Sequence, residues 1–69
     1  MKNVAVVINT KSFTEEFCKS MEIIIDRVFN YPAWETTVSG HRMCFLLVCE
    51  SGMEILKALE SADCIEIRE

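Results

Sequence analysis

Two continuous apolar segments predict the centre of a β-sheet. Residues 4–8 read VAVVI and residues 43–49 read MCFLLVC. Both have the length of a strand, and neither has the three-to-four-residue spacing of an amphipathic helix. A strand that is apolar on both faces is typically buried on both faces, as a strand in the middle of a sheet is. We therefore predict two central strands.

Two alternating segments predict the edges of the same sheet. Residues 34–39 (WETTVS) and residues 64–68 (CIEIR) alternate between core-forming and polar side chains. A period of two is typical of a strand with one face toward the core and the other toward water. The inward residues would be Trp34, Thr36 and Val38 in the first segment and Ile65 and Ile67 in the second.

Two helices are predicted between these strands. Residues 12–15 and 51–54 both have the capping-box pattern, in which a Ser hydroxyl and a Glu carboxylate satisfy free backbone N–H groups. Asn30 can take the left-handed conformation that ends a helix, and Pro32 prevents its continuation. The second helix should end before Asp63. At 100° per residue, the apolar arc of the first helix comprises Phe13, Phe17, Cys18, Met21, Ile24, Ile25, Val28 and Phe29.

The resulting element order is βαββαβ. This order is typical of the α+β ferredoxin-like sandwich, a four-stranded antiparallel sheet in the order 4-1-3-2 with two helices on one face. The hydrophobic pattern agrees independently, because the two continuous segments are strands one and three, which are central in that arrangement. We predict one such domain over residues 1–69.

The turn at Gly40 and His41 decides which face of the second central strand meets the helices. Gly at the first of two turn positions suits a type II′ hairpin, and a two-residue loop would pair Val38 with Met43. In this register Met43, Phe45 and Leu47 face the helices, whereas Cys44, Leu46 and Val48 face away.

One face of the predicted sheet stays uncovered, because right-handed crossovers place both helices on the same side. An apolar centre with polar flanks is the layout of a protein interface, and a patch of several hundred Å² is more than a monomer usually exposes. The alternative is an ordinary sheet face with a few exposed small apolar side chains. The predicted interface comprises Ala5, Val7, Glu35, Thr37, Cys44, Leu46, Val48 and Glu66. We expect Leu46→Glu to abolish association through this face while the helices stay intact.

Composition narrows the classes of partner. A domain of 69 residues buries only about 60% of the surface of its unfolded chain, so partners that extend the core are common at this size. The net charge of −4, with seven basic residues among eleven acidic ones, disfavours nucleic acid and anionic membranes. RNA recognition on this fold uses exposed aromatic residues on the central strands, and the predicted register turns Phe45 inward.

The compartment is predicted from the apolar segments. No segment approaches the length of a membrane span, and the apolar residues 4–8 are too few for a secretory signal. We therefore expect a cytoplasmic protein.

Candidate chemistry is sparse. Cys18, Cys44, Cys49 and Cys64 lie in apolar segments, so reduced thiols packed as small hydrophobic side chains are the favoured interpretation, and no metal or cofactor is expected. His41 is a single histidine in a turn, where solvation is more common than catalysis. No nucleophile and base can be paired, and an enzyme is not expected.

The leading hypothesis is a small acidic, non-enzymatic interaction or regulatory module. It would act as an inhibitor or adaptor through the open sheet face and would associate as a homodimer. The alternative is a sensor of a small ligand. In that interpretation both helices start at the same edge of the sheet and bring Thr10, Lys11 and Gly52 around an anion.

Overall fold

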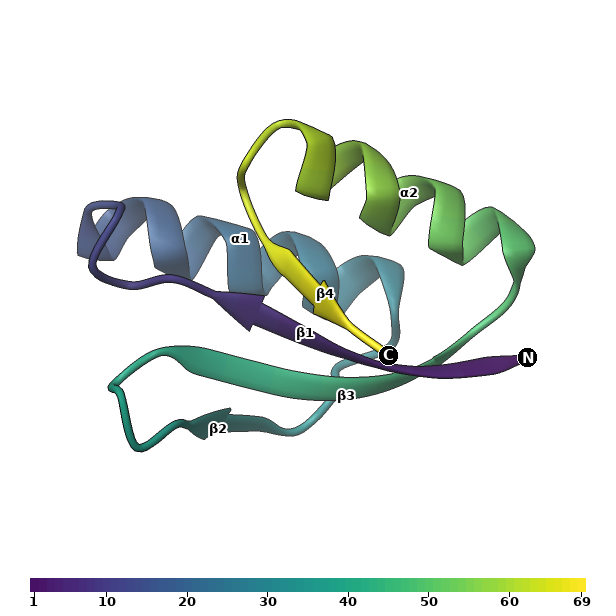
Figure 1. The fold of residues 1–69 in the computed structure, drawn as a ribbon, viewed down its shortest axis with the longest axis horizontal. Helices are drawn as coiled ribbons and strands as arrows, with labels where there is room; N and C mark the ends of the chain where they lie inside the picture. Colours follow the sequence, from purple (N-terminus) through teal and green to yellow (C-terminus); the bar gives the residue numbers. More distant parts are fainter.

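Six elements of secondary structure follow one another in the order βαββαβ, as predicted. The structure is a computed structural model that describes residues Met1–Glu69. The elements are β1 (Lys2–Ile8), α1 (Glu15–Val28), β2 (Trp34–Thr36), β3 (Arg42–Val48), α2 (Glu50–Ser61) and β4 (Glu66–Arg68). All strand pairs are antiparallel and the sheet order is β2-β3-β1-β4, which is the predicted 4-1-3-2 order read from the opposite edge (Figure 1). The predicted ferredoxin-like α+β sandwich is therefore confirmed.

Helix α1 covers the half of the sheet that contains β2 and β3. Arg42 donates two hydrogen bonds to the carboxylate of Glu22, from Nε at 3.1 Å and from Nη2 at 3.2 Å. The indole Nε1 of Trp34 donates to Asp26 at 2.7 Å. Because both acceptors belong to α1 and both donors to the sheet, these bonds fix the position of the helix over the strands.

Helix α2 covers the half of the sheet that contains β4. The carboxylate of Glu60 accepts a hydrogen bond of 2.9 Å from the backbone N–H of Ile67, in the middle of β4. Free N–H groups at the edge of a sheet can pair with strands of other molecules. This edge N–H group is occupied by a side chain of the protein's own helix.

The core lies between the helices and one face of the sheet. Its twelve buried side chains are Val4, Val6, Ile8, Cys18, Met21, Ile25, Cys44, Leu46, Val48, Met53, Leu56 and Ile65. Both helices lie on the same side of the sheet in Figure 1, and no segment covers the other side. Neither helix is long and apolar enough to cross a membrane.

The hairpin between β2 and β3 differs from the predicted one. Trp34 is paired with Cys44 and Thr36 with Arg42, so the connection is the five-residue loop 37–41, not a two-residue turn. The backbone N–H of Thr37 bonds to the carbonyl of His41 at 2.7 Å, which closes this longer loop. Val38, predicted to face the core, is fully exposed at its tip.

The longer loop reverses the face that β3 presents to the helices. The observed pairing is displaced by three residues from the predicted one, and an odd displacement moves every side chain to the opposite face of a strand. The predicted orientation of Cys44, Leu46 and Val48 is therefore wrong, because all three are buried in the core. Met43, Phe45 and Leu47 lie on the face that the helices leave uncovered.

The helix starts also differ, while the helix ends are as predicted. The N-cap of α1 is Thr14, two residues after Ser12, and its hydroxyl accepts a backbone N–H. The N-cap of α2 is Cys49, two residues before Ser51. Asn30 has a φ of 60°, the left-handed conformation predicted to end α1.

Candidate functional site

The uncovered face of the sheet is the candidate functional site, and we call it the open face. Strand register places its residues in rows across the sheet, because residues paired across antiparallel strands share a face. The open face comprises Asn3, Ala5, Val7, Glu35, Met43, Phe45, Leu47, Glu66 and Arg68.

The open face has a ridge beside a furrow. The ridge consists of Met43, Phe45 and Leu47 on β3, and the furrow consists of their cross-strand partners Val7, Ala5 and Asn3 on β1. Phe45 is 64% exposed and Leu47 is 58% exposed, whereas Ala5 is 8% and Val7 2% exposed. A shallow hollow of about 470 Å³ lies beside Phe45 and above Ala5. The face therefore has protruding apolar side chains beside a shallow hollow.

Charged residues flank the ridge and the furrow. Glu35 lies on β2, at one side, and Glu66 and Arg68 lie on β4, at the other, where their side chains form an ion pair of 3.1 Å. Two carboxylates and one guanidinium give this face a net charge of −1, against −4 for the whole chain. Most of the protein's negative charge thus lies elsewhere.

The structure retains part of the interface predicted from the sequence. Ala5, Val7, Glu35 and Glu66 lie on the open face by register, although Ala5 and Val7 are themselves buried there. Thr37 belongs to the hairpin loop. Cys44, Leu46 and Val48 lie on the opposite face, in the core beneath the helices, and Met43, Phe45 and Leu47 take their places on the open face.

The two loops assigned to a ligand site do not meet. β1 and β3 are antiparallel and Ile8 is paired with Arg42, so β1 ends where β3 begins. The helices that follow these strands consequently start at opposite ends of the sheet. Thr10 and Lys11 lie at one end and Gly52 at the other, so the expectation that both helices start at one edge is wrong.

Thr10 instead connects the first loop to the hairpin. Its hydroxyl donates to the carbonyl of Gly40 at 3.0 Å and lies 3.5 Å from Nδ1 of His41. His41 is half-buried by this contact, so it is not the fully solvated residue that its place in a turn predicts. The three residues hold two loops together at one end of the sheet.

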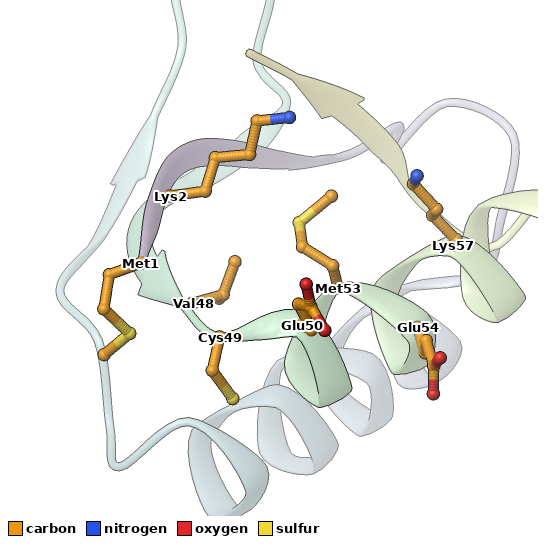
Figure 2. Close-up of a pocket in the computed structure, with 8 residues that line it drawn as sticks. All are labelled: Met1, Lys2, Val48, Cys49, Glu50, Met53, Glu54 and Lys57. Atoms are coloured by element: carbon orange, nitrogen blue, oxygen red, sulfur yellow. The ribbon is translucent and has the colours of Figure 1, made fainter.

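A second hollow lies where α2 begins. It has a volume of about 580 Å³ and is lined by Met1, Lys2, Val48, Cys49, Glu50, Met53, Glu54 and Lys57 (Figure 2). Figure 2 shows that the thiol of Cys49 points away from Lys2 and Lys57. The ammonium group of Lys2 forms an ion pair with Glu69. The thiol of Cys49 and the ammonium groups of Lys2 and Lys57 therefore do not point toward a common position in this hollow.

The cysteines divide into two buried and two accessible thiols. Burial, followed by the nearby carboxylates of Asp26 and Glu22, raises the pKa of Cys44 to about 12. Burial also raises the pKa of Cys18. The hydroxyl of Ser51, 3.2 Å from Sγ, and the backbone at the helix start lower the pKa of exposed Cys49. Sequence patterns missed this difference because Cys49 is predicted as the end of a buried strand.

We expect alkylation to follow this order. At pH 8 iodoacetamide should modify Cys49 first and Cys44 last, with Cys44 slower by a factor on the order of 1000, because a buried thiol reacts only when the domain opens. Mass spectrometry of peptides over time measures each rate. Ser51→Ala should slow the modification of Cys49 alone. Equal rates for Cys44 and Cys49 would contradict the burial of Cys44.

A smaller apolar surface lies on the helix layer. Phe17, Ile24 and Val28 share the flank of α1 opposite Glu22 and Asp26, so this flank faces away from Arg42 and Trp34. The prediction that these three side chains are in the core is only partly right, because they are 37 to 48% exposed. Ile55 of α2 is 44% exposed. Each is less exposed than Phe45 or Leu47, so we rank the open face first.

The open face thus has a defined shape, charge and set of residues. No protein-family model, no curated protein and no solved structure matches this chain.

Proposed function

We propose that this protein is a small acidic, non-enzymatic interaction module that acts by binding a polypeptide through the open face. The observation that carries the proposal is the exposure of Phe45 and Leu47 in the middle of a sheet whose other face is fully used by the core. Aromatic residues at the centre of a patch with a polar rim are typical anchors of protein interfaces.

The free energy available at this face supports specific binding. Full burial of a Phe or Leu side chain stabilises by about 1.5 to 3 kcal/mol, and these two side chains are a little more than half exposed in the free domain. Completing their burial is therefore worth about 2 to 4 kcal/mol in total. Two central anchors of this strength fit a regulatory partner, such as a target that the protein inhibits or a second protein that it recruits.

The chemistry of the remaining surface supports a role without catalysis. The one thiol with a lowered pKa, Cys49, has Ser51 beside it and points away from the nearby lysines. All four thiols are free, which fits residence in the cytosol.

Photo-crosslinking tests the proposed binding face. We expect a benzophenone amino acid at position 47 to give a covalent protein adduct in cells. The same group at position 38, on the fully exposed loop tip, or at position 55, on the helix layer, should give none. Gel mobility and mass spectrometry detect the adducts. Adducts from position 55 alone, or from no position, would contradict binding through the open face.

A further inference from the structure

The open face is complementary in shape to itself. We propose that its partner is a second copy of this chain, and that two copies pack open face against open face around a two-fold axis that runs parallel to the strands between β1 and β3. This inference rests on the proposed function and deepens it by naming the partner. A two-fold interface requires one patch to match itself, so bulky groups must meet recesses of the same patch.

The ridge and the furrow meet this requirement. A two-fold rotation about that axis places each β3 over the β1 of the other copy, because the two strands lie side by side on either side of the axis. Phe45 of one copy then lies over Ala5 of the other, at the shallow hollow of about 470 Å³. Met43 lies over Val7 and Leu47 over Asn3 in the same way. The contact is a face-to-face sheet packing, with the sheets about 10 Å apart.

The same rotation fixes which charges meet at the rim. It places the β4 of one copy over the β2 of the other, since these strands are the outer neighbours of β1 and β3. Glu35 and Glu66 belong to the same row as Met43 and Val7, so Glu66 of one copy faces Glu35 of the other, and Arg68 lies one row further along the strands. Arg68, which pairs with Glu66 at 3.1 Å, thus offsets a contact between two carboxylates at each rim. The apolar ridge and furrow supply the attraction between the copies, and the rim charges modulate it.

The area that such an interface needs is a moderate share of the molecular surface. A stable interface of standard size buries about 800 Å² on each partner, and the chain has 4626 Å² of accessible surface. The interface would take roughly a sixth of that surface. This is about the share that one broad face has in a body measuring 30 × 22 × 20 Å.

Charge reversal tests the proposed geometry. Arg68→Glu should weaken self-association about tenfold, because it places a third carboxylate at each of the two rims. Glu35→Arg should instead strengthen it, because a guanidinium then faces Glu66 of the other copy. Sedimentation equilibrium of the full chain measures the affinities of both variants and of the original chain, and thermal unfolding checks that each variant folds.

A second measurement detects the contact between Ala5 of one copy and Phe45 of the other directly. In a mixture of ¹³C-labelled and unlabelled copies, a filtered nuclear Overhauser spectrum should connect the Ala5 methyl group to the Phe45 ring of the other copy. A dimer that lacks this contact, or a Glu35→Arg variant that associates more weakly than the original chain, would overturn the proposed arrangement.

The crosslink from position 47 separates this inference from the proposed function. An adduct of twice the chain mass of 7.9 kDa supports the second copy. An adduct with a different protein, together with a chain that stays monomeric at high concentration, overturns the second copy and leaves the open face as an interface. A monomeric chain without any adduct overturns both.

Discussion

Replacing Leu46 by Glu is expected to unfold the domain. Leu46 is 6% exposed and packs in the core between the sheet and the helices. A carboxylate at that position would be buried without a partner, which costs several kcal/mol, and the packing of the Leu side chain would also be lost, which costs about 2 to 5 kcal/mol. A domain of 69 residues has a stability of only about 3 to 10 kcal/mol.

Circular dichroism and urea titration measure this effect. The variant should lose its cooperative unfolding transition, whereas the conservative change Leu46→Met should keep it with a stability lower by about 1 kcal/mol. A folded Leu46→Glu variant with intact helices would return Leu46 to the surface and would contradict the register of β3.

Replacing the neighbouring residue Phe45 by Glu is expected to have the opposite outcome. Phe45 is 64% exposed, so the change should leave the free energy of unfolding of the isolated domain within about 0.5 kcal/mol of its original value. Self-association should weaken by about a thousandfold, because the loss of a central anchor, about 2 kcal/mol, occurs twice in a two-fold interface.

The matched control for this variant is Val38→Glu, which adds the same charge at a fully exposed position outside the open face. Sedimentation velocity should show a monomer for Phe45→Glu and an unchanged distribution for Val38→Glu. Equal effects of the two changes would mean that added charge alone, and not the loss of Phe45, controls association.

The order of the strands in the sheet could be predicted from the sequence. Residues 4–8 and 43–49 are apolar without interruption, whereas 34–39 and 64–68 alternate. This contrast distinguishes central from edge strands, because only a central strand has paired neighbours on both sides, even though Phe45 and Leu47 of β3 are exposed on the open face. The βαββαβ order then left few compatible topologies.

The face of β3 could not be predicted in the same way. When both faces of a strand are apolar, its own pattern does not specify which face meets the helices, and the turn must decide. Gly40 has a φ of 87° and suits a short hairpin, but the hydroxyl of Thr37 accepts the N–H of His41 at 3.0 Å and stabilises a five-residue loop. Arg42 offered one signal in the sequence for the correct face of β3. Its side chain can pair with Glu22 of α1 only when Arg42, and with it Cys44, Leu46 and Val48, faces the helices.

The five-residue loop 37–41 determines which residues of β3 lie on the open face. The general expectation of an uncovered face depends on chain topology and did not require the register. The identity of the protruding residues did require it, so Met43, Phe45 and Leu47 could not be found by pattern alone. Antiparallel pairing of β1 and β3 likewise separates Thr10 from Gly52, a consequence of strand direction that the proposed ligand site had overlooked.

The bond between Glu60 and the N–H of Ile67 limits how large an assembly can become. A sheet grows into a filament only by adding strands at its margins, and here one margin is occupied by a carboxylate while β2, at the other, is three residues long. In the pair proposed above, stacking would use the open face of both molecules. Such a pair would be closed, because neither margin of the sheet favours the addition of another strand.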